Sequence, residues 1–481
     1  MLEGKKFNLF LKVGILLMLT SIIFTACAPT TVVETVEKVV EKEVIQTQII
    51  EQIVEQEVVI TATPSPVTGT LNVLGFTQGD EIAKVRVDTF IEKFPQVELV
   101  MTEGSLDAQQ FLTAVASGNV PDLIYTNRDV LSTYATRGAL LPLDDCVARQ
   151  DIDMTQYRES AVKQVTVAGS LYGIPEFFNI ITVLVNDKAL ADAGVAIEDI
   201  DTSDWDKIKE VNEKLTRMTD GKVTRIGFDP KLPEFLPLWV AANGGAMLSD
   251  DGRTALLDDP IVVEALEFAV ALHEPAGGRQ DFMAFRDTWD FFGSQNQFMS
   301  DQLGAFPMEQ WYVNVLVGSS PDVELAVLPF LTREGEIITY ATGNTWAIPR
   351  GSKNLDAACA FMKTVTSPEA WTAAAQTRAD MRAEEGTTFT GVYTANKLAD
   401  QIIFGEIMQP SGSEVFDAAV KVLVEVQDYA FSMPASPAGS EFKQAWQDAV
   451  NRVLAGEQTA AEALAQAQQE AQDALDKAWS R

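Results

Sequence analysis

Residues 116–145 read ASGNVPDLIYTNRDVLSTYATRGALLPLDD. Just before this stretch, the apolar face at 111–115 predicts a helix, which is expected to end at Ser117-Gly118 because glycine readily takes the left-handed conformation that closes a helix. Pro121–Tyr125 then has the short apolar run of a buried strand. A helix followed directly by a buried strand is typical of an α/β protein.

The same alternation continues on both sides of this stretch. Strands are expected at 71–76, 97–101, 184–186, 226–228 and 325–328, and helices at 81–94 and, in the mainly helical part after residue 355, at 459–479. A chain of 481 residues is too long for one ordinary core. The sequence therefore predicts an α/β protein of at least two domains.

The composition is that of a globular protein with a strongly acidic surface. Apolar residues make up 47% of the chain and charged residues 22%, but the formal net charge is −33. Such a surface repels phosphate backbones, so nucleic acid is not expected as a partner.

The first 27 residues have the features of an export signal. Lys5 and Lys6 precede a mostly apolar stretch from Leu9 to Phe24, which is short for a spanning helix, and small residues stand just before Cys27. The segment resembles a bacterial lipoprotein signal peptide, which implies that Cys27 is lipidated and begins the mature chain. The alternative is a membrane-anchoring helix that is left uncut. Either way, the bulk of the protein is expected outside the cytoplasm.

Residues 28–69 differ in composition from the rest of the chain. Residues 31–66 are built mainly from Val, Ile, Glu, Gln, Lys and Thr and contain neither an aromatic residue nor glycine. We expect a stalk that lifts the folded body off the membrane and ends in the stiff segment 63–66, Thr-Pro-Ser-Pro. A short coiled coil is the alternative, although the heptad pattern is not sustained.

Two cysteines, Cys146 and Cys359, remain beyond Cys27. An oxidising compartment permits a disulfide between them, but buried, unreactive thiols are at least as well supported. These few cysteines exclude a zinc ribbon or finger, and no metal site is expected. The single histidine, His273, ends an apolar helical run and is expected to be structural, which argues against the many enzyme classes that need a catalytic histidine.

Several short motifs follow one another in a characteristic order. After 116–145 they are Gly169–Pro175 with the pattern G-x-x-Y-G-x-P, Leu184–Asn186, 190–194, 205–215, Ala241–Gly245, Gly343–Ile348, 353–369 and 453–464. No single motif is specific, but their order and spacing across residues 70–481 resemble the extracellular solute-binding proteins of family 1, the class of the maltose-binding protein.

The resemblance implies two α/β lobes joined by a hinge, as in type II periplasmic binding proteins, with a ligand held between them. Lobe 1 is expected to comprise 70–177 and 329–367, and lobe 2 to comprise 180–327 and 370–481. The chain would first cross between the lobes near 175–181 and return near 328–332. Clefts between domains are preferred ligand sites, and hinge closure around a ligand is a common motion.

Sugars are the leading ligand class for such a family, and aromatic side chains cover their apolar faces while polar side chains bind their hydroxyls. By the resemblance, Trp311 aligns with a stacking aromatic residue and is the best single candidate. Thr126 stands where the maltose-binding protein stacks a tryptophan, which argues against a maltodextrin. The candidate ligand-binding residues are Phe76, Gln78, Asp80, Glu81, Thr126, Asn127, Asp129, Glu176, Trp239, Trp289, Trp311, Gly343, Asn344 and Trp346. For every aromatic residue except Trp311, a position in the core is the main alternative.

The function that the resemblance implies is that of the substrate-binding component of an ABC importer. The expected partners are a small solute, membrane permease subunits and the membrane itself through the lipid on Cys27, and the chain is expected to act as a monomer without a cofactor. Two alternatives stay open: a secreted carbohydrate-active hydrolase, since a glycosidase needs only two carboxylates, and a sensory binding lipoprotein without transport. The sequence lacks G-x-S-x-G, H-E-x-x-H and P-loop motifs, which argues against the hydrolase. The identity of the solute is left open.

Overall fold

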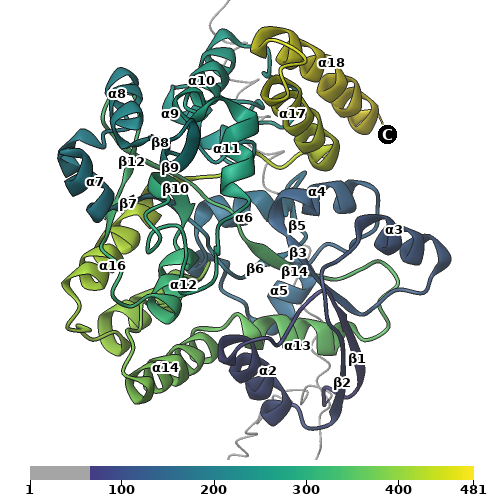
Figure 1. Ribbon diagram of the computed structural model, residues 1–481. Coiled ribbons are helices and arrows are strands. Elements are labelled where there is room, and N and C mark those ends of the chain that lie inside the picture. Colours follow the sequence, from purple (N-terminus) through teal and green to yellow (C-terminus); the bar gives the residue numbers. More distant parts are fainter. Residues whose placement is uncertain (1–65, 481) are drawn as a thin grey trace, which may run out of the picture. The chain divides into compact units, whose positions relative to one another are not determined.

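A strand, a helix and a second strand open the part of the chain that the computed structural model describes, residues 66–480 (Figure 1). The predicted signal peptide, Cys27 and the predicted stalk up to residue 65 lie outside the described residues. From Val67 onward the chain forms a single compact unit.

The strands agree with the expected positions and include several that were not expected. They are β1 (Gly69–Leu74), β2 (Val97–Thr102), β3 (Leu123–Asn127), β4 (Thr166–Val167), β5 (Ser170–Leu171), β6 (Ile174–Pro175), β7 (Ile181–Asn186), β8 (Arg217–Thr219), β9 (Lys222–Phe228), β10 (Leu303–Glu309), β11 (Leu325–Leu328), β12 (Phe330–Leu331), β13 (Ile337–Tyr340), β14 (Asn344–Ala347) and β15 (Ala430–Phe431).

The helices connect and cover these strands. They are α2 (Glu81–Lys93), α3 (Ala108–Ser117), α4 (Arg128–Thr136), α5 (Asp144–Gln150), α6 (Glu159–Val165), α7 (Asp187–Ala193), α8 (Trp205–Leu215), α9 (Leu236–Ala242), α10 (Pro260–Ala271), α11 (Arg279–Arg286), α12 (Trp311–Ser319), α13 (Leu355–Val365), α14 (Pro368–Glu385), α15 (Lys397–Ile402), α16 (Glu414–Val426), α17 (Gly439–Leu454) and α18 (Ala460–Trp479).

Sequence signals account for several of these boundaries. Gly118 closes α3 in the left-handed conformation, with φ of 72°, as expected from the sequence. Helix α18 begins with a capping box, in which the Thr459 side chain accepts from the backbone N–H of Glu462 and the Glu462 side chain accepts from the backbone N–H of Thr459.

Two five-stranded sheets form the framework. The first has the order β2-β1-β3-β14-β6, in which β1, β2 and β3 are parallel and β14 is antiparallel to both of its neighbours. The second has the order β11-β7-β10-β9-β8, with β7 antiparallel to β10 and β11. A small third sheet has the order β12-β13-β15, in which β12 and β13 follow the last strand of the second sheet and β15 follows β14 of the first.

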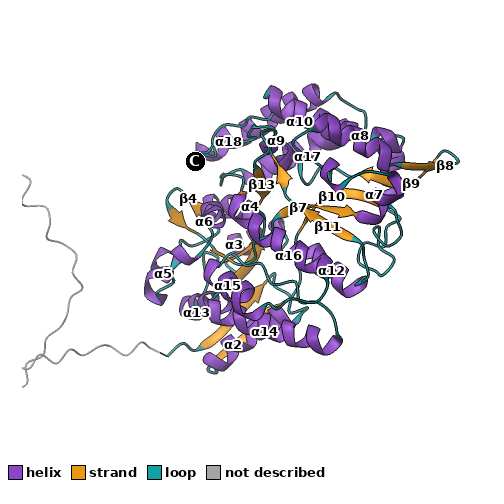
Figure 2. Ribbon diagram, turned by 90° about the vertical axis from the view of Figure 1, so that its left-hand side faces the viewer, coloured by secondary structure: helices purple, strands orange, loops and turns teal. Residues whose placement is uncertain are grey.

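Both faces of the second sheet are covered by helices (Figure 2). Along β7, Leu184 packs in one hydrophobic cluster, whereas Val183 and Val185 pack in another. Successive side chains of a strand point to opposite faces, so a strand buried on both faces is continuously apolar. This is why Ile181–Val185 carries almost no polar residue.

The chain passes between the two sheets at 176–180, close to the predicted first crossing. We propose that the return comes later than the expected 328–332, because β14, the next strand of the first sheet, begins only at Asn344. The intervening strand β13 is held beside β7 by the Thr339 hydroxyl, which accepts from the backbone N–H of Ile181 at 2.7 Å and donates to its carbonyl at 2.8 Å. A short hairpin not apparent in the sequence therefore delays the return.

Helix α14 packs against α2, which follows the first strand of the first sheet. Trp371 and Ala374 share a hydrophobic cluster with Ile82, and Arg378 forms an ion pair with Asp80 at 2.7 Å. The sequence-based division assigns residues 370–385 to lobe 2. Because α14 packs on α2, which that division places in lobe 1, we propose that α14 belongs to lobe 1 instead. The remaining lobe boundaries stay a proposal.

Cys146 of α5 and Cys359 of α13 form a disulfide with a Cα–Cα distance of 5.7 Å. Of the two alternatives that the sequence left open, the structure contains the disulfide. His273 is buried, and its Nδ1 lies 3.1 Å from the carbonyl oxygen of Val270. No helix within residues 66–480 is long and apolar enough to cross a membrane, and no acidic, histidine or cysteine cluster in the same range is arranged to hold a metal ion.

Candidate functional site

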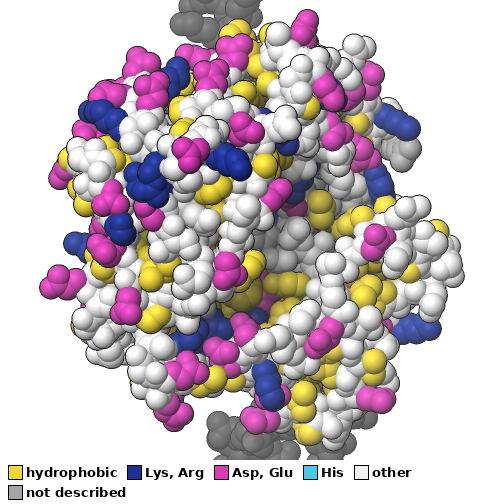
Figure 3. Space-filling model, viewed as in Figure 1, with side chains coloured by type: hydrophobic (Ala, Val, Ile, Leu, Met, Phe, Trp, Pro, Cys, Tyr) yellow, Lys and Arg dark blue, Asp and Glu magenta, His cyan; other side chains and the backbone are white. Residues whose placement is uncertain are grey.

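A cavity of about 410 Å³ lies where the ends of β3, β10 and β14 approach α17. Figure 3 shows the molecular surface hollowed near its centre, with hydrophobic side chains inside the hollow. The lining residues are Asn127, Arg128, Asp129, Gln164, Asn179, Lys231, Glu234, Phe235, Leu248, Phe291, Met308, Glu309, Trp311, Tyr340, Thr342, Gly343, Asn344, Met433, Pro434, Ala435, Gly439, Phe442, Lys443, Trp446 and Gln447. The volume lies within the range typical of small-molecule sites.

The end of β3 supplies the first wall. Asn127 is the last residue of this strand, and its side-chain oxygen accepts from Asn344 Nδ2 of the neighbouring β14 at 3.1 Å. Asp129 follows in the first turn of α4, where its carboxylate pairs with Lys443 of α17 at 2.6 Å. Polar groups from two strand ends and two helices therefore meet in this wall.

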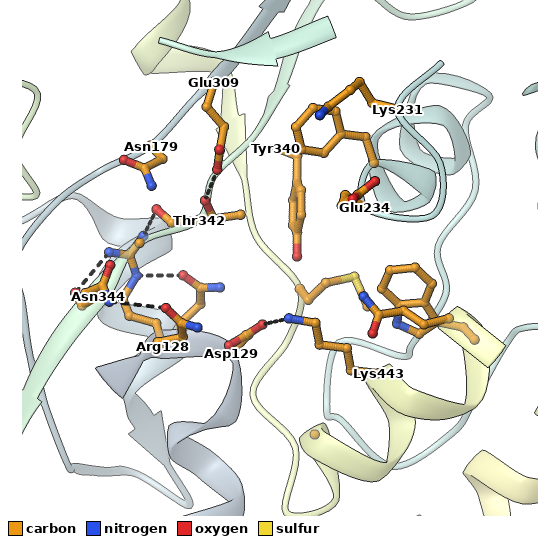
Figure 4. A pocket seen from close by; sticks show the side chains of 18 of the residues that line it. Arg128, Asp129, Asn179, Lys231, Glu234, Glu309, Tyr340, Thr342, Asn344 and Lys443 are labelled. Atoms are coloured by element: carbon orange, nitrogen blue, oxygen red, sulfur yellow. Dashed lines mark hydrogen bonds and ion pairs between the residues drawn. The ribbon is translucent and has the colours of Figure 1, made fainter. Parts of the chain in front are cut away.

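Arg128 holds the two chain crossings together beneath this wall (Figure 4). Its guanidinium donates to the carbonyl oxygens of Phe177 and Thr342, and its Nε donates to Gln164 Oε1 at 2.8 Å. Burial lowers the pKa of Arg128 to about 10, which still leaves it charged at neutral pH. We assign Arg128 to the scaffold of the site, because its donors are directed to the protein.

Gly343 is required where Arg128 joins the two chain crossings. It has φ of 142°, and a Cβ atom at this position would clash with the carbonyl oxygen of Phe177 and with the Arg128 guanidinium. Its own carbonyl oxygen accepts from the backbone N–H of Arg128 at 3.0 Å. Glycine is thus needed here for close approach of the two crossings.

The end of β10 supplies the opposite wall. One carboxylate oxygen of Glu309 accepts from the Trp311 indole N–H at 2.7 Å, and the other accepts from the Thr342 hydroxyl at 3.0 Å. These bonds hold the Trp311 ring beside the cavity. Phe292, which is 67% exposed, lies nearly parallel to that ring, with centroids 6.3 Å apart and an interplanar angle of 14°.

The segment between β9 and α9 adds Lys231, Glu234 and Phe235 to the cavity. In Figure 4, Lys231 and Glu234 lie across the cavity from Arg128 and Asn344. Tyr340, at the end of β13, stands between these groups, and burial raises the pKa of its phenol. The cavity thus combines aromatic faces with hydrogen-bond donors and hydrogen-bond acceptors.

Five of the candidate residues from the sequence line this cavity: Asn127, Asp129, Trp311, Gly343 and Asn344. They come from three separate stretches of the chain, and the two sheets bring them together. Trp311, the best single candidate, is among them.

The other nine candidates lie elsewhere. Trp239 and Trp346 are fully buried in the core, Phe76 packs on Trp346, Thr126 is buried, and Trp289 is half-buried outside the cavity wall. Asp80 caps α2 and pairs with Arg378, Glu81 pairs with the same arginine, and the Gln78 side chain donates to Met101 Sδ at 3.1 Å. Glu176 is buried in an ion pair with Arg86. The loop after β1 therefore serves the contact between α2 and α14, and large aromatic residues fill the core, as their size favours.

Several lining residues escaped sequence reasoning. Lys231, Glu309 and Lys443 are single charged residues on separate elements, and nothing in the local pattern of Lys231 or Lys443 distinguishes them from surface charges. Glu309 alone carried a usable signal, because it ends a buried strand two residues before Trp311. The rim contributed by α17 lies more than 300 residues from Asn127 in the sequence, so only the tertiary fold identifies it.

A family model described as bacterial extracellular solute-binding protein matches residues 86–405, about two thirds of the chain. The chain belongs to this family. It is accordingly a solute-binding protein rather than an enzyme, and it acts outside the cytoplasm.

Among curated proteins, this solute-binding protein is 23% identical over 287 residues to the maltotriose-binding protein of Pyrococcus abyssi, covering 59% of each chain. It is 20% identical over 275 residues to the arabinooligosaccharide-binding protein of Bacillus subtilis, covering 55% of this chain and 60% of the relative. The match thus spans about 60% of the length of these relatives.

Solved structures share the fold. The ABC substrate-binding protein of Listeria monocytogenes in complex with cycloalternan has a TM-score of 0.67 at 19% identity and covers 86% of this chain and 99% of its own. The sugar-binding protein MalE of Xanthomonas citri has a TM-score of 0.64 at 18% identity and covers 85% and 98%. The predicted fold class, an α/β protein of the type II periplasmic-binding-protein kind, is confirmed.

Proposed function

We propose that this solute-binding protein is the substrate-binding component of an ABC importer and that it binds a sugar in the cavity lined by Trp311. The support is the combination of a half-buried indole, held in place by Glu309, with amide and charged side chains on the facing walls. Sugar rings need both an aromatic face and polar partners for their hydroxyls. The curated relatives named above are described as binding maltotriose and arabinooligosaccharide, which agrees with this ligand class.

The proposal includes a hinge and a membrane anchor. We propose that the crossings at 176–180 and 341–343, which Arg128 joins, form the hinge between the two lobes, and that the lobes close on the sugar. We also propose that the lipid at Cys27 keeps the protein near its permease subunits, and that it functions as a monomer.

Isothermal titration calorimetry against a panel of mono- and oligosaccharides tests the proposal. A sugar present at a hundredfold excess over its Kd is expected to add about 2.7 kcal/mol to the free energy of unfolding, which a thermal melt detects. Trp311→Ala is expected to weaken binding by roughly tenfold to a hundredfold through the loss of the stacking face.

Trp479→Ala is the matched control. Trp479 is also half-buried and also donates its indole N–H within the protein, to the carbonyl oxygen of Gly252 at 3.2 Å, but it lies outside the cavity wall. Its loss should leave the Kd unchanged. If no sugar in the panel binds, or if both variants weaken binding equally, the cavity is not the sugar site.

A further inference from the structure

Lys231 differs from the other cations of the cavity wall. Arg128 donates to backbone carbonyls and to Gln164, and Lys443 pairs with Asp129 at 2.6 Å. Among the residues that the structure describes, none forms an ion pair or a hydrogen bond with the Lys231 ammonium, and Figure 4 shows no interaction line ending on it.

Aromatic rings surround this ammonium. Its Nζ lies 5.9 Å from the ring centre of Phe235, 5.7 Å from that of Phe291 and 5.9 Å from that of Phe306. Cation–π attraction offsets part of the cost of removing the charge from water, but aromatic faces accept none of its three N–H donors. These donors are left for a group that enters the cavity.

Nearby carboxylates do not take this role. Asp229 accepts the backbone N–H of Lys231 at 2.7 Å and pairs with Arg286 at 3.2 Å. Both oxygens of Glu309 are engaged by Trp311 and Thr342, and Glu234 is exposed to solvent at the rim, where water screens its charge.

The charged groups around Lys231 shift its pKa in opposite directions. Burial and the neighbouring Arg286 lower the pKa of Lys231, whereas Asp229, Glu234 and Glu309 oppose this change. The ammonium of Lys231 is half-buried and has no direct partner in the described part of the protein, and an anionic group on the ligand would supply one.

We propose, as an extension of the proposed sugar-binding function, that the ligand is an acidic sugar whose carboxylate binds the ammonium of Lys231 while a sugar ring stacks on Trp311. A carboxylate matches the single charge that Lys231 offers. The charge-assisted hydrogen bond is stronger than one to a neutral hydroxyl, so the site should prefer a uronic acid to the corresponding neutral sugar.

Calorimetry with uronic acid oligosaccharides and their neutral counterparts of the same linkage tests this preference. The wild-type protein is expected to bind an acidic member at least about tenfold more tightly than its neutral partner. Lys231→Met should remove this preference by weakening binding of the acidic sugar about tenfold more than binding of its neutral partner, whereas Lys231→Arg should retain most of the preference.

Lys209→Met is the matched control, because Lys209 is exposed and its ammonium lies 5.4 Å from the ring centre of Phe268, outside the cavity wall. Lys209→Met should leave the affinities for the acidic and the neutral sugar unchanged.

If the wild-type protein binds neutral sugars as tightly as acidic ones, the acidic-sugar inference is wrong while the sugar-binding function stands. A preference for sugar phosphates over uronic acids would overturn it as well, and failure of both sugar classes to bind would overturn the sugar-binding function too. The comparison within the wild-type protein decides the matter even if Lys231→Met does not fold.

Discussion

His273 is a buried titratable residue with a structural setting. Its ring lies edge-on to Phe282, with centroids 4.2 Å apart, and Nδ1 faces the carbonyl oxygen of Val270. Burial lowers the pKa of His273 to about 4, although Asp229 partly opposes the effect. The folded protein therefore holds the neutral imidazole at pH values at which the unfolded chain is already protonated.

This difference predicts a specific loss of stability in acid. Because the unfolded state binds the proton more readily, the contribution of His273 is complete above pH 6.5 and is lost as the pH falls toward 4. Relative to His273→Gln, the wild-type protein should lose up to about 3 kcal/mol of unfolding free energy over this interval. Urea denaturation of both proteins at several pH values measures the difference.

The comparison with the variant is necessary because Asp400 acts in the opposite direction. Burial raises the pKa of Asp400 to about 6, so its contribution grows as the pH falls through part of the same interval. Both proteins contain Asp400, and its effect cancels in the difference. A pH-independent difference between them would contradict the prediction.

At the scale of secondary-structure elements, the disulfide joins two helices distant in sequence. Cys146 on α5 and Cys359 on α13 are 213 residues apart and both are buried. A cross-link over so long a segment restricts the unfolded chain strongly. The two helices also carry an exposed ion pair between Arg149 and Asp356, which adds little stability in water.

We therefore predict that the double substitution Cys146→Ala with Cys359→Ala lowers the free energy of unfolding by about 2–5 kcal/mol. Denaturant unfolding of the oxidised wild-type protein, the variant and the reduced wild-type protein measures this loss. The reduced protein is the control, since it loses the bond without losing the two sulfur atoms. Equal stability of the oxidised and reduced proteins would show that the bond contributes nothing.

At the scale of the whole molecule, the proposed lipid anchor determines where the cavity operates. Residues 1–27 have the features of an export signal that ends at Cys27. We predict that Cys27→Ser abolishes lipid labelling and moves the protein from the membrane fraction to the soluble extracytoplasmic fraction. Metabolic labelling with a radioactive fatty acid, followed by fractionation, measures both effects.

A Cys146→Ser variant serves as the control and should remain labelled and membrane-bound. If the Cys27→Ser protein still fractionates with the membrane without lipid, the segment is an uncut anchor helix rather than a lipoprotein signal. Either outcome leaves the sugar-binding cavity unaffected, because the cavity is formed entirely from residues beyond 126.

Sequence reasoning succeeded where the signal is local. The apolar alternation around 71–125, the glycine at the end of α3 and the helical stretch 459–479 each depend on neighbouring residues, so β1, α2, β2, α3, β3 and α18 could be predicted from the chain alone. Asn127 and Asp129 of the candidate site could be predicted for the same reason, because they directly follow a recognisable strand.

By itself, the sequence determined the fold class and the class of molecule, because these depend on periodicity and on motif order along the chain. Only the tertiary structure decided which of the other aromatic residues fill the core, as Trp346 does, and which line the cavity, as Phe291 does. It alone paired Cys146 with Cys359, placed α14 on α2 and brought Lys231 and Lys443 to one cavity. The physical reason is that burial and charge pairing are set by contacts between segments hundreds of residues apart, which leave no pattern in the local sequence.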